Sequence, residues 1–273
     1  MLRTWLAILA VLAGVSLSFA EDAGSLLSQD GRWEQARKDL AEGKAAEAKS
    51  VLEQLQAEYP AEPDLQLFLG ISQLRLRNPD AAVIAVKRAI ELDPKHIEAR
   101  TLLGWIELEV RGNAGAAIAE YTKVVEIRPD SPQAHVNLGV ALKNNGEINR
   151  ALESYNRALG LQKNYVEALS NRGWVYVEQE KWPEARRDFN LALKIKPKDQ
   201  GALQGLAQVL EKTRDYAGAQ SVLSQLNAES PNFVHWLQWG RLGLIRFWWI
   251  PFLIALALFV KGRLMKARIR TNG

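Results

Sequence analysis

Cysteine is absent from this chain of 273 residues, and histidine occurs only three times. Without cysteine the protein has no disulfide scaffold, no iron–sulfur cluster, no thiolate zinc site and no cysteine nucleophile. Since the three histidines are scattered along the chain, a histidine-based metal site is not expected either. The composition therefore predicts no metal.

Catalytic and nucleotide-binding motifs are missing as well. The sequence has no glycine-rich phosphate loop, no G-x-G-x-x-G, no H-E-x-x-H, no G-x-S-x-G and no S-x-x-K. Carboxylate pairs such as Glu107 and Glu109 stand two positions apart, so they point to different sides of a helix. We expect no catalytic residue and no cofactor, and we predict that the protein is not an enzyme.

Excess positive charge is confined to the chain ends. The formal net charge is +4, but residues 21–240 contain 27 basic and 31 acidic side chains, and the other eight basic residues lie outside that range. A region of mild negative charge offers no electrostatic footprint for a phosphate backbone. Nucleic acid is therefore not expected as a partner, and no small-molecule substrate is evident.

Long apolar runs occur only near the two ends. The first run covers residues 5–19 and follows Arg3. The small residues Ser18 and Ala20 stand at the positions that a signal peptidase requires before its cleavage site. We expect residues 1–20 to be a signal peptide, whether cleaved or kept as an anchor, and 21–28 to be a short linker.

The second run, 242–260, holds one charge, Arg246, in nineteen residues. At ~1.5 Å per residue such a helix covers about 28 Å, enough to span a bilayer, whereas a buried core helix is the alternative. Tryptophans that gather around the first half of such a run and cations after it are typical of a membrane interface and a cytoplasmic flank. The expected interface residues are Trp236, Trp239, Trp248 and Trp249.

The two ends together predict one topology. We expect a juxtamembrane linker over 234–241, a transmembrane helix over 242–260 and a basic cytoplasmic tail over 261–273. The protein would then be a single-pass protein of the inner (cytoplasmic) membrane, with its folded part in the periplasm and its C-terminus in the cytoplasm.

Between the ends, small residues recur every 34 or 35 positions. One series is Gly70, Gly104, Gly139, Gly173 and Ala207. A second series is Ala48, Ala82, Ala117, Ala151, Ala185 and Ala219, and bulky residues such as Tyr121, Tyr155 and Phe189 follow it by four positions. Prolines close most units, at Pro60, Pro94, Pro129, Pro197 and Pro231.

This periodicity predicts two helices per unit. Each unit has two stretches with apolar residues at helical spacing, separated by a polar or glycine-containing break. Glycine or alanine where the helices cross permits close approach, and the bulky residues fill the space behind. Because one hairpin cannot cover its own apolar side, neighbouring units stack and share a core. We therefore predict an all-α fold, a solenoid of six helix-turn-helix repeats followed by the single transmembrane helix.

The pattern resembles that of the tetratricopeptide repeat family over residues 29–233. The implied units are 29–62, 63–96, 97–131, 132–165, 166–199 and 200–233. The third has one extra residue, which falls between Gly104 and Gly112. Three departures occur: Arg172 replaces a leucine, Lys163 replaces a closing proline, and Gln35-Ala36 stands for Leu-Gly in the first unit.

The resemblance implies a protein-binding groove lined by the first helix of each unit. In this family, residues at the second, fifth, ninth and twelfth places of a unit point into it. The expected groove residues are Leu67, Ile71, Thr101, Trp105, Val136, Val140, Ser170 and Trp174. Packing on the next unit is an alternative role for Trp105 and Trp174. A clamp for a terminal carboxylate is not expected, because only Asn137, Lys143 and Asn171 stand near.

These expectations define a membrane-tethered protein–protein interaction scaffold of the cell envelope. Its partners would be another envelope or membrane protein and the lipid bilayer. The alternative is a membrane-complex assembly subunit that acts through its transmembrane helix and tail, with the repeats as a spacer.

Overall fold

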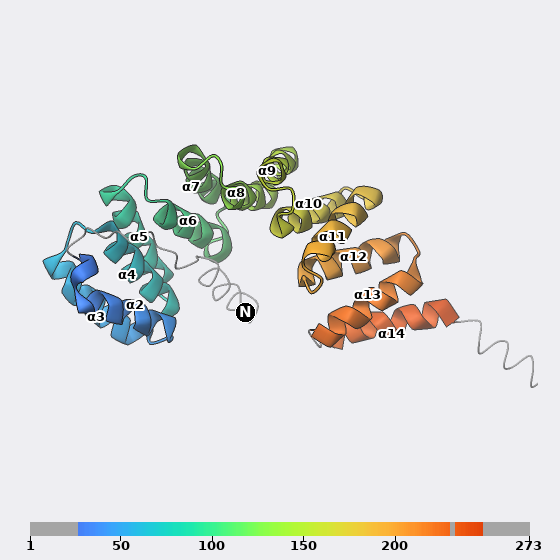
Figure 1. The fold of residues 1–273 in the computed structure, drawn as a ribbon, viewed down its shortest axis with the longest axis horizontal. Helices are drawn as coiled ribbons and strands as arrows, with labels where there is room; N and C mark the ends of the chain where they lie inside the picture. Colours follow the sequence, from blue (N-terminus) through green and yellow to red (C-terminus); the bar gives the residue numbers. More distant parts are fainter. Residues whose placement is uncertain (1–26, 230–232, 248–273) are drawn as a thin grey trace, which may run out of the picture. The chain divides into compact units, whose positions relative to one another are not determined.

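The computed structural model describes residues 27–229 and 233–247. Within them the chain forms a short 3₁₀ helix, thirteen α-helices and one π-helical turn (Figure 1). Contacts divide the chain into two compact units, one ending at Leu161 and the other beginning at Gln162.

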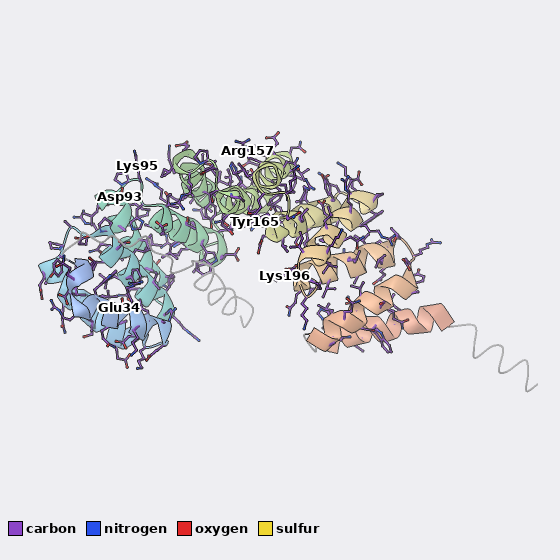
Figure 2. All side chains as sticks on the ribbon, in the orientation of Figure 1. Glu34, Asp93, Lys95, Arg157, Tyr165 and Lys196 are labelled. Atoms are coloured by element: carbon purple, nitrogen blue, oxygen red, sulfur yellow. The ribbon has the colours of Figure 1, made fainter. Side chains whose placement is uncertain are left out.

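The first compact unit consists of four helix pairs. Its elements are η1 (Leu27–Gln29), α2 (Gly31–Ala41), α3 (Ala45–Glu58), α4 (Pro63–Arg75), α5 (Pro79–Leu92), α6 (Ile97–Trp105), the π turn η2 (Ile106–Val110), α7 (Ala114–Ile127), α8 (Pro132–Asn144) and α9 (Ile148–Leu161). Each helix packs on the one before it. Exposed positions carry charge, as at Lys95 and Arg157 (Figure 2).

The second compact unit continues the same scheme. It contains α10 (Val166–Glu178), α11 (Trp182–Ile195), α12 (Gln200–Lys212), α13 (Tyr216–Glu229) and α14 (Phe233–Phe247). Consecutive helices again pack on each other, and α10 also contacts α12. The prediction of an all-α repeat array is confirmed.

The prolines that close the repeats follow the ends of the second helices, as the sequence predicts. The second helices α3, α5, α7 and α11 end two residues before Pro60, Pro94, Pro129 and Pro197 respectively. The residue before a proline is pushed out of helical geometry, so the helix stops there. Pro63, Pro79 and Pro132 instead open helices, where the missing amide costs no hydrogen bond.

Glycines on the first helices allow close contact with large side chains on the second helices. A Cβ on Gly104 would lie 2.8 Å from the Tyr121 ring, and one on Gly139 would lie 2.6 Å from Tyr155. Phe189 is approached from two sides, since Cβ atoms on Gly173 and Gly205 would lie 2.7 and 2.2 Å from it. Real Cβ atoms cannot come so near, so only glycine fits without repacking.

The turn inside each pair contains one residue with left-handed backbone geometry. These residues are Gly43, Arg77, Gly112, Gly146, Glu180 and Arg214, with φ between 55° and 83°. In the fifth pair the amide of Glu180 donates to the Val177 carbonyl (3.1 Å), and Lys181 donates to Tyr176 (2.8 Å). This is the Schellman arrangement that ends a helix.

The extra residue of the third unit is absorbed by the π turn. There the amide of Arg111 donates to the carbonyl of Ile106 (3.1 Å), and Asn113 donates to Glu107 (2.7 Å), one position further back than in the other turns. Single-turn π segments accommodate one inserted residue without disturbing the helix on either side. Gly112 therefore still reaches its left-handed position.

The prediction of a transmembrane helix requires correction. Among residues 27–229 and 233–247, no helix has the length and apolar character needed to cross a membrane. α14 begins at Phe233 and packs on α13, and Leu242, the expected first residue of the membrane segment, is fully buried. The end of a repeat array has an apolar face that needs cover, and α14 supplies it.

The predicted helix over 242–260 and the predicted single-pass location in the inner membrane are therefore not supported. Residues 248–260, the predicted tail over 261–273 and the predicted signal peptide over 1–20 lie outside the described residues.

Candidate protein-binding face of the first helices

The predicted groove residues lie on the first helices α4, α6, α8 and α10. In the first compact unit four of them are buried: Leu67 is 1% exposed, Val136 3%, Ile71 8% and Trp105 8%. Thr101 and Val140 are half-buried. On this unit, therefore, the predicted face is mostly a packed surface.

The second compact unit leaves more of this face accessible. Ser170 and Trp174 on α10 are half-buried, and the corresponding places on α12 hold half-buried Gln204 and exposed Gln208. The Ser170 hydroxyl donates to Asp199 (3.4 Å), and Gln204 lies 3.4 Å from the His235 ring. These four side chains combine one aromatic ring with neutral hydrogen-bonding groups.

Trp174 and Trp105 stand at the same place of their units but differ in environment. Trp174 meets the edge of Phe189 with ring centroids 5.7 Å apart and an interplanar angle of 70°. Trp105 is sealed into the core of the first unit and directly precedes the π turn. Packing is therefore the structural role of Trp105, whereas Trp174 keeps surface that a partner could cover.

A charged cluster lies at the start of α6. The His96 ring is 3.1 Å from the Asp64 carboxylate on α4 and 3.3 Å from Glu98. Burial lowers the pKa of His96, but the hydrogen bonds to Asp64 and Glu98 outweigh it and raise the pKa to about 9. The imidazolium form thus joins two neighbouring first helices at neutral pH.

One ion pair was not anticipated from the sequence. Arg172, noted as a departure from leucine, forms two hydrogen bonds with Asp188 on α11, at 2.7 and 2.8 Å. Asp188 is 2% exposed. The signal in the sequence was Arg172 itself, since the other units from the second to the sixth have leucine at its place. The place of Asp188 is less distinctive, because the third and fourth units have Glu120 and Ser154 there.

The side chains near the expected clamp positions do not make a clamp. On α8 the Gln133 amide donates to Asn137 (2.7 Å), and Lys143 is half-buried. The second places of the units hold Asp64, Glu98 and Glu167, whose charge repels a carboxylate. Asn171 lies in the other compact unit.

Of the expected interface tryptophans, the structure describes the side chain of Trp239. Its indole donates to the Ser224 hydroxyl on α13 at 2.9 Å, so the ring helps α14 to cover that helix. The side chain of Trp236, and residues Trp248 and Trp249, lie outside the described part. Within the described ranges no group of three or more acidic or histidine side chains is arranged to hold a metal ion.

Family comparisons cover most of the repeat region. The tetratricopeptide repeat model matches residues 39–106 and 176–238, a TPR repeat model matches 111–146, and a further tetratricopeptide repeat model matches 136–200.

Several curated proteins are similar to part of this chain. The photosystem I assembly protein Ycf3 of Acaryochloris marina is 30% identical over 35% of this chain and 68% of its own length. Protein O-mannosyl-transferase TMTC3 of Homo sapiens is 27% identical over 52% of this chain, and tetratricopeptide repeat protein 21B of Xenopus laevis is 28% identical over 69%. The chain spans only 16% and 14% of the last two.

Solved structures show the same fold. PilW, described as a type IV pilus biogenesis factor, has a TM-score of 0.67 at 16% identity and covers 75% of this chain and 94% of its own. PilF of Pseudomonas aeruginosa has a TM-score of 0.66 at 16% identity, covering 78% and 96%. MamA has a TM-score of 0.52 at 24% identity, covering 59% and 94%.

Proposed function

The chain belongs to the tetratricopeptide repeat family, and from this premise we propose that it is a scaffold that holds a segment of a partner protein on its first-helix face. One observation carries the proposal: α10 and α12 keep exposed surface at the fifth and ninth places while the neighbouring core residues Leu169 and Leu203 are buried. A packed core does not need a tryptophan at such a half-open place. Aromatic side chains with remaining surface are frequent anchors of protein interfaces.

The chemistry of this face defines the partner segment. Trp174 offers an aromatic edge, and Ser170, Gln204 and Gln208 offer neutral hydrogen-bonding groups. In the second compact unit we propose that Ser170 and Trp174 make contacts with a partner. Within the first compact unit we propose a contact role for Thr101 and Val140, with Leu67, Ile71, Trp105 and Val136 as the floor beneath them. An apolar or weakly basic segment fits this face better than an acidic one, because of the carboxylates at the second places.

A finer proposal concerns the partner's location. The signal-like pattern of residues 1–20 supports another protein of the cell envelope as the partner. PilF and PilW share the fold of this chain. The role in pilus biogenesis is a property of PilW and is not carried over to this chain.

Site-directed photo-crosslinking tests the proposed face. A photo-reactive residue at Gln208, on the face, should trap the partner in cells, whereas one at Arg187, an exposed place on the second helix α11, should not. Mass spectrometry of the adduct identifies the protein. Equal yields at the two places, or a partner trapped from Arg187 alone, would remove the basis for this face.

A further inference from the structure

A groove of about 390 Å³ lies between α3, α4 and α5, away from the first-helix face. Its α4 residues, Gln66 and Gln73, stand about 130° around the helix from Leu67 and Ile71, given 3.6 residues per turn. The groove is therefore distinct from the site proposed above.

Two places on α4 that hold aliphatic or aromatic residues in the fifth and sixth units hold glutamine here, whereas the first unit has Arg32 and Asp39 at these places. The third and fourth units have Arg100 and His135 at the place of Gln66. In the sixth unit the places of Gln66 and Gln73 are taken by Leu203 and Leu210, which are 1% and 4% exposed. In the fifth unit Leu169 and Tyr176 stand there. A branched or aromatic side chain fills such a space, whereas glutamine brings a carboxamide that must be satisfied.

Those carboxamides have no hydrogen-bond partner among the described residues. Gln56 on α3 also lines the groove, so three amide groups, each a donor and an acceptor, face one space. Gln66 is only 3% exposed. A ligand that pairs with these amides would form hydrogen bonds that the described part of the protein does not itself supply.

The rest of the lining is aliphatic and electrically neutral. Leu69 and Ala85 lie among its residues, and Ile84 is 72% exposed at its side. The charges on the rim are compensated within their own helices, Glu53 by Lys49 at 2.8 Å and Arg88 by Glu91 at 3.0 Å. A neutral, amide-lined groove matches a neutral ligand that has its own donors and acceptors.

We propose that this groove is a second protein-binding site, which takes an extended peptide segment with an aliphatic side chain. The peptide main chain pairs with Gln56, Gln66 and Gln73, and its aliphatic side chain packs between Leu69, Ala85 and Ile84. Backbone pairing supplies affinity, and the apolar contact supplies selectivity, as in other recognition of extended segments.

A phage-displayed library of linear dodecapeptides, selected on the full chain, is the probe. Recovered peptides should carry an aliphatic residue and should bind the double variant Gln66→Leu/Gln73→Leu at least tenfold more weakly. That variant copies the pair Leu203 and Leu210, so its melting temperature should equal or exceed that of the wild type. Ile84→Glu should weaken binding without loss of helix signal, and Gln54→Leu, an exposed glutamine on α3, should leave binding unchanged.

Two further measurements decide what occupies the groove. N-methylation of the recovered peptides should reduce binding at least tenfold, because it removes main-chain donors. Selection that yields no peptide preferring the wild type over the double variant, or peptides that bind equally after N-methylation, overturns the proposal. So does a concentration-dependent dimer, seen by sedimentation and abolished in the double variant, since a second copy would then be the occupant.

Discussion

The third and fifth repeats both have tryptophan at the ninth place, but the two side chains differ in exposure and in their contacts. Trp105 is 8% exposed and belongs to the core, whereas Trp174 is half-buried and touches Phe189 through its edge. The third repeat also has an extra residue in a π turn, and the fifth has a buried ion pair where the sixth has Leu206 and Val222. One repeat pattern thus allows a packing residue and a candidate contact residue at equivalent places.

Truncation of the two tryptophans should separate these roles most clearly. Trp105→Ala should lower the free energy of unfolding by about 3–5 kcal/mol, because a large buried side chain leaves a cavity. Trp174→Ala should cost about 1–2 kcal/mol, mainly the edge contact with Phe189 and some apolar area. Chemical denaturation of both variants measures the difference. Equal losses would mean that Trp174 is also a core residue, and the proposed face would lose its anchor.

The ion pair of the fifth repeat should give the next largest effect. Arg172→Leu should destabilise the protein by about 3 kcal/mol, because Asp188 is left buried without its cation. The double variant Arg172→Leu/Asp188→Val copies Leu206 and Val222 of the sixth repeat and should regain most of that loss. A double variant as unstable as the single one would show that the pair does more than compensate charge.

The starts of the two repeats should differ in their response to pH. His96, which directly precedes the third repeat, has a pKa raised to about 9, above its ordinary value of 6.5, so its stabilising contribution is complete below pH 6.5 and is lost as pH rises through 9. Tyr165 directly precedes the fifth repeat in the same way, and its pKa is raised to about 12 by burial and by Glu167.

Thermal melts from pH 6 to 9.5 test this difference. The gap between the wild type and His96→Gln should be widest at pH 6 and shrink toward pH 9.5, while Tyr165→Phe should show a constant gap. A gap for His96→Gln that does not change with pH would contradict the proposed imidazolium contacts.

The turns should give the smallest effect. Glu180 holds a φ of 55° in the fifth repeat, and Gly112 holds a φ of 66° in the third. Left-handed geometry costs a residue with a Cβ about 1 kcal/mol. Glu180→Gly should therefore gain up to about 1 kcal/mol in the free energy of unfolding, and Gly112→Ala should lose a similar amount. Opposite signs in equilibrium denaturation are the expected result.

Much of the fold was predictable, since its signals are local. The spacing of Gly104 and Tyr121, and of Gly139 and Tyr155, predicted which side chains meet across each pair. The extra residue before Gly112 was located from the period, but its conformation was not. A π turn and a longer loop would both restore the period, so only the backbone hydrogen bonds distinguish them.

The candidate face was less predictable. The position of a residue in the repeat specifies the direction of its side chain. The exposure of that side chain depends on which residues of the neighbouring helix pack against it. Register predicted that Leu67 and Ile71 lie on the face, but it could not predict that packing buries both of them. The hollow beside Gln66 likewise becomes visible only when α3 and α5 close around it.

The sequence by itself determined the helix pairs, their order, the closing prolines and the contacts of glycine with aromatic residues, because these depend on residues close in the chain or one period apart. The tertiary structure alone decided which tryptophan is buried, that Arg172 pairs with Asp188, and that α14 packs on α13 with Leu242 in the core. An apolar run carries the same hydropathy whether it covers a repeat or crosses a bilayer. Which surface it buries against is settled by packing.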